Sequence, residues 1–383
     1  MKTTNFIFSL LVIGSVLAGM LRSAPAGAQT KGGMLAPTKD EILAAAKQEG
    51  KLSLVPGFDK TTIIPLVAAF TKKYPFIDVS FDLVTGIAAG QRQLFEMAAG
   101  KATVDAFSPS AAHWSEYFKQ NLIKKYDFRA MAKAGQLKIP VEMLDESGVI
   151  AWLGTNTGVL AYNTKQVTAD KAPKGWDSCL DPQWKGKLSV DTKPNTLTWL
   201  IPAWGVEKVF DFARKLKGND PIWVRGQTGT LARMAAGEIA VDCSMYFHTA
   251  RRSFIRDPAQ PIKLVIPNPV PLSFHEPEGI YINAKHPYAG LLWIEFLASK
   301  EGQDIIDSVD PGKASFLVEG TLANNLLKGA KVSLCAGGCR DQEDKMMERI
   351  ATEAWGLPKG GVAPKKAGIE KSAFRRRCYL GPN

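Results

Sequence analysis

The chain has 383 residues and is 45% hydrophobic, which is enough for two domains with ordinary cores. Its formal net charge is +11, and loss of residues 1–28, which carry Lys2 and Arg22 and no acidic residue, lowers the charge to +9. A basic protein can meet anionic ligands or membrane surfaces, but a lysine-rich solvated surface explains this charge better than a nucleic-acid partner does. We therefore expect no nucleic-acid function.

The first 28 residues have the pattern of a secretory signal peptide. Lys2 supplies the positive end, residues 6–20 form an apolar run, and Ala26-Gly27-Ala28 offers small side chains for cleavage. That run is too short to span a bilayer comfortably, and no later segment approaches the length of a transmembrane helix. We expect a periplasmic protein that starts at Gln29. Intact-mass analysis of the exported protein tests this, and a retained signal segment would contradict it.

Strands and helices alternate along the next part of the chain. Thr38 to Glu41 fits a capping box that opens a helix ending near Gly50. Further elements follow in order: a strand over 52–55, a helix up to Lys73, a strand over 77–84, a helix over 91–99, a strand over 104–108 and a helix over 114–118. This alternation is typical of a parallel sheet covered by helices on both faces.

The segment 159–191, VLAYNTKQVTADKAPKGWDSCLDPQWKGKLSVD, has the most specific pattern. A strand, VLAYN, is followed by turn signals at PKGW, DP and KGK, and a second strand, KLSVD, ends in Asp191. This order resembles the segment by which clamp-like periplasmic solute-binding proteins pass from one lobe to the other. The resemblance is to ABC-transporter binding proteins for ferric iron, phosphonates, thiamine or polyamines. The runs GEIAVD and HPYAGLLWIEFLASKEGQ also resemble recurrent runs of that family.

The second half repeats the strand–helix pattern up to residue 330. The expected elements are helices near 197–204 and 210–216, a helix capped by Thr228-Gly229-Thr230, strands at 239–242 and 264–267, and a strand at 279–283. The proline-rich run PNPVPL reads as a connection, and His286 before a proline reads as a helix cap. Beyond Ala330 the chain departs from the family pattern, and an added helix and a loose tail are expected there.

The resemblance implies an α/β fold: a two-lobed periplasmic-binding-protein-like clamp of mainly parallel sheets with helices on both faces. The implied parts are a signal peptide (1–28), the first part of lobe 1 (29–157), lobe 2 (158–270), a return to lobe 1 (271–335) and a C-terminal extension (336–383). Hinge strands are expected near 157–163 and 268–279. The implied function is capture of a small solute between the lobes and its delivery to an inner-membrane ABC permease, by a monomer without a cofactor.

The motifs of catalysis are missing from the chain, which predicts that it is not an enzyme. The four histidines are scattered, with neither HExxH nor zinc-type spacing, and neither G-x-S-x-G nor a Walker loop occurs. A secreted enzyme or a ligand sensor on the same clamp fold stays open as an alternative.

Five cysteines in an oxidising compartment predict at least one disulfide. The pairing lies within Cys335 and Cys339 or runs from that pair to Cys378. Cys179 with Cys243 is the alternative pairing, and the residues alone do not decide between them.

The positions of the tyrosines bear on iron binding, because ferric members of the family commonly carry adjacent tyrosines in the second lobe. No two of the eight Tyr here are neighbours, and only Tyr246 lies near the corresponding place. We predict no tyrosinate cluster and no metal site, with Tyr246 in the cleft wall; a ferric-iron-binding member of the family is the alternative. Trp152, Trp199, Trp204 and Trp223 are expected in the core, with a cleft wall as the second possibility.

Small hydroxyl residues follow several predicted strands in both halves, at the sheet edge where ligands of open parallel sheets bind. Helix N-termini there would present free N–H groups to an anion, although each residue could simply be a cap. The sequence therefore predicts a small anionic ligand, such as a carboxylate or a phosphonate. The candidate ligand-binding residues are Thr85, Gly86, Ser108, Thr192, Lys193, Arg225, Thr228 and Tyr246.

Overall fold

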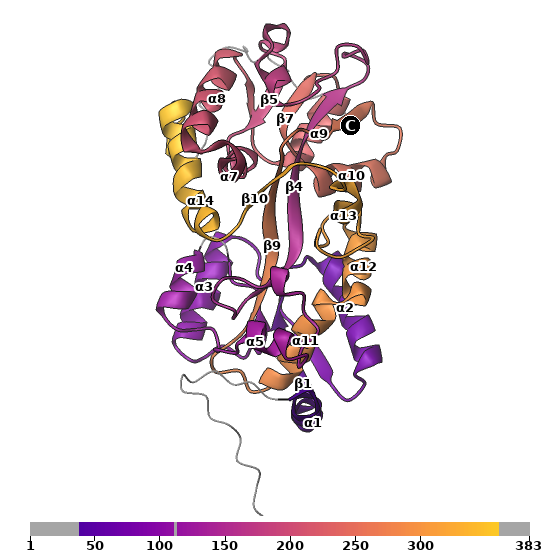
Figure 1. The fold of residues 1–383 in the computed structure, drawn as a ribbon, viewed down its shortest axis with the longest axis vertical. Helices are drawn as coiled ribbons and strands as arrows, with labels where there is room; N and C mark the ends of the chain where they lie inside the picture. Colours follow the sequence, from indigo (N-terminus) through magenta and orange to yellow (C-terminus); the bar gives the residue numbers. More distant parts are fainter. Residues whose placement is uncertain (1–37, 111–112, 360–383) are drawn as a thin grey trace, which may run out of the picture. The chain divides into compact units, whose positions relative to one another are not determined.

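The computed structural model describes residues 38–110 and 113–359 (Figure 1). The expected signal peptide and Cys378 lie outside these residues. Within the described part of the chain, no helix has the length and apolar character needed to cross a membrane.

The first part of the chain forms three short parallel strands with helices between them. Thr38 and Glu41 make the predicted capping box, and Gly50 ends the first helix in a left-handed conformation. The strand expected over 77–84 is shorter than predicted, because its one partner, the first strand, pairs only with 78–81. The elements are α1 (Lys39–Glu49), β1 (Lys51–Val55), α2 (Lys60–Lys73), β2 (Asp78–Phe81), α3 (Ile87–Ala98), β3 (Ala106–Phe107), α4 (Trp114–Lys119), α5 (Phe128–Lys133) and a 3-10 turn (Val141–Met143).

Two long antiparallel strands, β4 (Ala151–Asn163) and β9 (Val270–Ile280), connect the two halves of the sheet (Figure 1). All residues of β4 are buried, and it pairs with β9 over 151–157 and with β7 and β8 beyond. The sheet order is β2-β1-β3-β9-β4-β7-β5-β6, with β10 on β9 and β8 on β4. The run PNPVPL, expected to be a connection, enters β9 at Val270, which agrees with the strand expected near 268–279, and its last residues pair with β10.

The second half repeats the strand–helix alternation with two departures from the predicted helices. The helix expected near 197–204 is divided into two short helices, because Pro202 has no N–H group to continue the series of helical hydrogen bonds. Thr228 and Thr230 lie inside the helix that they were expected to cap; Gly226 precedes it. The elements are 3-10 turns (Trp176–Leu180, Pro182–Trp184), β5 (Leu188–Asp191), α6 (Asn195–Thr198), α7 (Ile201–Trp204), α8 (Val206–Gly218), β6 (Ile222–Val224), α9 (Gln227–Ala235), β7 (Val241–Tyr246), α10 (Phe247–Arg256) and β8 (Ile262–Val265).

After β9 the chain returns to the first half and then crosses to the second. The remaining elements are α11 (Pro287–Ala298), α12 (Lys300–Val309), α13 (Leu322–Leu326), β10 (Val332–Cys335), α14 (Gly338–Arg349) and a π-helical turn (Ile350–Ala354). His286 precedes α11, but its side chain makes no cap; its Nδ1 lies 2.9 Å from Asp105 Oδ2 instead. Local sequence could not show this, because Asp105 lies far away in the chain.

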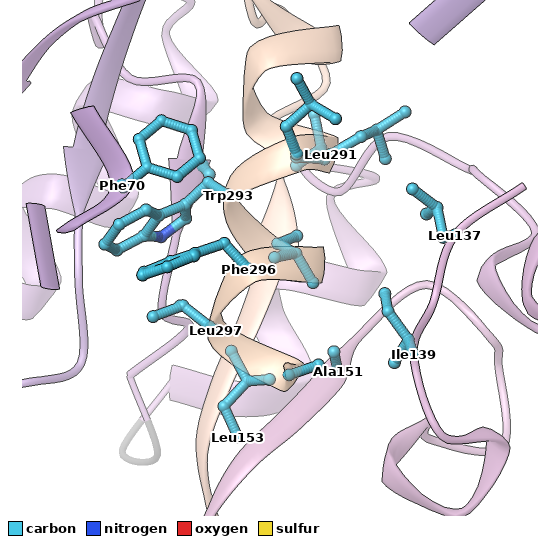
Figure 2. Packing of buried hydrophobic residues seen from close by; sticks show 14 of the residues in the cluster. Phe70, Leu137, Ile139, Ala151, Leu153, Leu291, Trp293, Phe296 and Leu297 are labelled. Atoms are coloured by element: carbon cyan, nitrogen blue, oxygen red, sulfur yellow. The ribbon is translucent and has the colours of Figure 1, made fainter. Parts of the chain in front are cut away.

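Separate hydrophobic cores lie on either side of the long strands. In the first, Trp293 and Phe296 of α11 pack on Phe70 of α2, with ring centroids 5.2 and 5.6 Å from the Phe70 ring (Figure 2). The second surrounds α8 and takes in Ile350 and Trp355 from the C-terminal extension. The helix expected beyond Ala330 is therefore α14 with the turn after it, and residues 346–357 contribute to the second core, whereas most of the expected tail lies outside the described residues.

The α/β prediction is confirmed, with a mixed sheet. Neighbours pair in parallel within each half, β1 with β2 and β3, and β5 with β6 and β7. The pairs of β4 with β7, β8 and β9 are antiparallel. Two disulfides are present, Cys335–Cys339 and Cys179–Cys243, so the pairing within 335–339 and the alternative pairing form together. The lobe boundaries and the hinge role of β4 and β9 stay predictions.

Candidate functional site

A polar cavity of about 250 Å³ lies where β5 and β7 end, beside the middle of β4 and β9. The carboxyl ends of parallel strands are the usual ligand edge of such a sheet. Residues of both halves and of α14 surround the cavity: Trp114, Ser115, Asn156, Lys193, Asn195, Trp199, Tyr246, His275, Arg340, Asp341, Glu343, Asp344 and Met347. The cavity therefore combines aromatic walls with hydrogen-bonding groups and charges of both signs.

One wall of the polar cavity is aromatic. The rings of Trp199 and Tyr246 stack with centroids 5.4 Å apart and an interplanar angle of 22°. Burial raises the pKa of the Tyr246 phenol, and Asp191 and Glu343 raise it further. Tyr246 is therefore a neutral phenol at physiological pH when no cation is bound. In the described ranges, no group of three or more His, Cys, Asp or Glu is placed to hold a metal ion.

A buried carboxylate from α14 forms another side of the cavity. Glu343 is 4% exposed, and its Oε1 accepts hydrogen bonds from Asn195 Nδ2 at 2.7 Å and from Trp199 Nε1 at 2.8 Å. Arg340, one turn earlier on α14, pairs with its other oxygen, Oε2. Three donors thus hold one carboxylate group inside the cavity.

A charged network lies beside the cavity, where Lys313 meets residues of β4 and β9, and two of its members, Asn156 and His275, line the cavity. Lys313 Nζ lies 3.2 Å from Glu276 Oε1 and donates to Asn156 Oδ1 at 3.1 Å. His275 Nδ1 lies 3.0 Å from this ammonium and 2.9 Å from Glu276 Oε1. Burial alone would raise the pKa of Glu276, but Lys313 and His275 lower it to about 2. Burial and Lys313 lower the pKa of His275, so the imidazole is neutral near pH 7.

A larger, mostly apolar cavity of about 680 Å³ adjoins the polar one and shares Trp114, Ser115, Arg340 and Asp341 with it. Its aromatic lining is a series of neighbouring rings. Phe118 lies 5.2 Å from Trp114, Trp114 lies 5.1 Å from Trp152, and Trp152 lies 6.3 Å from Phe274, between ring centroids. Together the two cavities offer a solute both an apolar surface and a polar end.

The structure separates the residues that the sequence singled out. Lys193 and Tyr246 line the polar cavity, and Thr192 and Arg225 line a third one of about 200 Å³ next to α14. The other four candidates, Thr85, Gly86, Ser108 and Thr228, line none of these three cavities. The helix-N-terminus argument is weak for Lys193, because the helix that follows has only four residues.

Sequence reasoning missed several residues of the polar cavity. Asn195 and Trp199 follow β5 in TKPNTLTW, so their position after a predicted strand was a usable signal. Arg340 and Glu343 carried no such signal, because they belong to the extension beyond the family pattern. Trp199 was expected in the core, with a cleft wall as the second possibility; it is 1% exposed and also lines the cavity.

Comparison with a family model matches residues 108–335, under the description "Bacterial extracellular solute-binding protein". This match spans more than half of the chain, so the chain belongs to that family. Members of the family are non-enzymatic substrate-binding proteins of ABC transporters, which confirms the resemblance and the prediction that this chain is not an enzyme. The matched region ends at Cys335, so α14 lies outside it. No curated protein matches the chain by sequence.

Solved structures of binding proteins share the fold at low sequence identity. Iron-bound HitA from Pseudomonas aeruginosa is 17% identical, with 79% of this chain and 99% of that chain covered and a TM-score of 0.60. Trichodesmium IdiA (FutA), solved with iron and citrate, is 15% identical, with coverage of 80% and 100% and a TM-score of 0.63. An ABC-transporter substrate-binding protein from Agrobacterium tumefaciens is 18% identical, with coverage of 80% and 94% and a TM-score of 0.60. These likenesses confirm the type II periplasmic-binding-protein fold.

Proposed function

We propose that this protein captures a small anionic solute in the periplasm and delivers it to an inner-membrane ABC permease. The observation that carries the proposal is the polar cavity at the ends of β5 and β7, which holds Lys193 and the N–H donors of Asn195 and Trp199, two donors that already bind one carboxylate, that of Glu343. Hydrogen bonds to charged groups are stronger than neutral ones, so such donors suit an oxyanion. The solved binding protein from Agrobacterium, which serves an ABC transporter, supports the delivery step.

Capture requires contacts to both halves of the protein. Trp114 and Ser115 reach the cavity from the first half, and Lys193 and Tyr246 reach it from the second. A solute that contacts both halves favours a closed arrangement over an open one, and β4 and β9 are the segments about which the halves would move. The permease would then recognise the closed form.

Ferric iron is the second candidate solute, favoured by the iron-bound HitA and by the Trichodesmium protein with iron and citrate. The cavity argues against bare iron because Tyr246 is the one tyrosine in its lining, and no group of three or more His, Cys, Asp or Glu in the described ranges is placed to hold a metal ion. An iron complex of an anionic chelator stays within the proposal, since the chelator would present the oxyanions. Ferric citrate therefore belongs in the ligand panel together with free carboxylates and phosphonates.

A thermal-shift panel followed by calorimetry tests the proposal. A solute held at about 100 times its Kd adds roughly 2.7 kcal/mol to the free energy of unfolding. Lys193→Met should then weaken binding of the anion by roughly one to two decades, the equivalent of about 1.5–3 kcal/mol for a charged hydrogen bond. Lys185→Met, at an exposed position outside the three cavities, is the matched control.

Two outcomes would overturn the proposal. One is tight binding of a cation such as a polyamine with no response to anions. The other is an anion whose affinity is the same in the wild type and in Lys193→Met. Arg225→Ala and Thr85→Val complete the set: Arg225 lines the third cavity, and Thr85 is exposed and lines none of the three, so only the first of these variants should affect binding.

A further inference from the structure

The carboxylate of Glu343 lies in the position that a solute carboxylate would take. Its Oε1 receives the N–H groups of Asn195 and Trp199, at 2.7 and 2.8 Å, and its Oε2 receives Arg340. Both donors from the second half belong to the chain after β5, at the ligand edge of the sheet. A side chain of α14 therefore satisfies the donors on which anion binding at this edge depends.

The segment that carries Glu343 is fixed to the protein at both ends. Before it, the Cys335–Cys339 disulfide closes the turn between β10 and α14. After it, Trp355 enters the second core and donates a hydrogen bond to the Ala213 carbonyl oxygen at 3.0 Å. Such a tether keeps the local concentration of the Glu343 carboxylate high at the cavity, as an intramolecular competitor requires.

A second observation indicates that Glu343 does not satisfy all the polar groups at the cavity. Asn195 is 7% exposed, and its Oδ1 has no hydrogen-bond partner among the residues that the structure describes. A buried acceptor without a donor costs free energy, and a ligand group is one way to satisfy it. A hydroxyl or ammonium group next to a solute carboxylate would supply that donor.

We infer that Asn195 and Trp199 form a carboxylate-binding subsite, and that Glu343 occupies it as an internal competitor which a solute carboxylate displaces. This inference rests on the proposed function and specifies its ligand class as a monocarboxylate group, with a hydroxyl or ammonium group beside it. Inorganic phosphate fits less well, because Asp341 and Asp344 also line the cavity and repel a second negative charge.

Competition has a measurable consequence. A site that is free for only a fraction of the time has its apparent affinity reduced by that fraction. Glu343→Gln keeps the size of the side chain, but an amide cannot accept from donors on both of its terminal atoms, so either Arg340 or the pair Asn195 and Trp199 faces an NH2 group. The internal occupant is thereby weakened while the subsite donors stay in place.

The experiment uses the mature full-length protein and calorimetric titration with lactate, alanine and inorganic phosphate. Glu343→Gln should bind lactate and alanine at least tenfold more tightly than the wild type, with little change for phosphate. Glu353→Gln is the control, because Glu353 is an exposed partner of Arg349 and lines none of the three cavities. In the Glu343→Gln background, Trp199→Phe removes the indole donor, keeps an aromatic ring and should reverse the gain.

Hydrogen–deuterium exchange gives a second measurement that needs no variant. Lactate should raise the exchange of residues 338–349 in the wild type, because the solute displaces Glu343 and loosens α14. Protection of α14 by lactate, or carboxylate affinities that are equal in the wild type and in Glu343→Gln, would overturn the inference. If phosphate binds while the carboxylates bind neither protein, the subsite is refuted but anion capture stands; if no anion binds either protein, both are refuted.

Discussion

Replacing Lys313 by methionine should strongly destabilise the protein, because it leaves a buried carboxylate without its main partner. Lys313 and Glu276 have side-chain exposures of only 9% and 6%, and their charged atoms are 3.2 Å apart. Breaking a buried ion pair by removing one partner costs about 3–5 kcal/mol, whereas losing an exposed pair costs about 0–1 kcal/mol. Because both side chains are buried, Lys313→Met should cost about 3–5 kcal/mol, as expected for a buried ion pair.

The pH dependence of this effect has a definite sign. In the wild type the pKa of Glu276 is lowered to about 2, so its contribution to stability is present above pH 4.5 and is lost as the pH falls from 4.5 towards 2. Without Lys313, burial dominates and the pKa of Glu276 rises above its ordinary value. Protonation then relieves the penalty in the variant, so the stability difference should shrink as the pH falls from 7 to 4.

Urea denaturation at pH 7 and at pH 4, with the disulfides intact, measures both effects. Lys300→Met is the control for an exposed pair, since Lys300 and Asp304 have exposures of 58% and 52%. Adding Glu276→Gln to Lys313→Met should recover much of the lost stability. A cost below about 1 kcal/mol for Lys313→Met, or a cost that is independent of pH, would refute the reasoning.

Two further predictions concern stability. Replacing both Cys179 and Cys243 by serine should lower the free energy of unfolding by about 4 kcal/mol, because this disulfide joins residues 64 positions apart. The same change at Cys335 and Cys339, which are four positions apart, should lower it by about 2 kcal/mol. Urea denaturation of the two double variants compares these losses, and equal losses would contradict the dependence on loop length. Burial raises the pKa of Asp242 to about 6, so the ionised carboxylate lowers the free energy of unfolding above pH 6, and this loss disappears as the pH falls towards 3.8. Asp242→Asn should remove the rise in stability between pH 6 and pH 3.8, and an unchanged pH profile would refute the assignment.

Local sequence signals located the elements whose ends depend on neighbouring residues. The helix from Lys39 to Glu49 was predicted at both ends, because a capping box and a glycine C-cap involve only residues a few positions apart. The break at Pro202 and the extent of β2 were missed. The first depended on how far α6 runs, and the second depended on its one neighbouring strand.

The candidate site was predictable only in part. Lys193 lies two residues after β5, and the rule that ligands bind beyond the carboxyl ends of strands was enough to select it, whereas Tyr246, the last residue of β7, was selected by the resemblance to the family. The same rule also selected Thr85 and Thr228, which lie on exposed parts of their loops and helices. Position after a strand places a residue at the correct edge, but the packing of neighbouring elements decides whether a cavity forms there.

Patterns within short stretches were enough to predict the alternation of strands and helices, the family and the lack of an enzyme's motifs. Only the tertiary structure brought Glu343 to Asn195 and Trp199, across about 150 positions of the chain. Likewise, only folding joined Lys313 to Glu276 on β9. Contacts of this kind arise when separate elements pack together, and no periodicity or local motif encodes which buried donor meets which distant carboxylate.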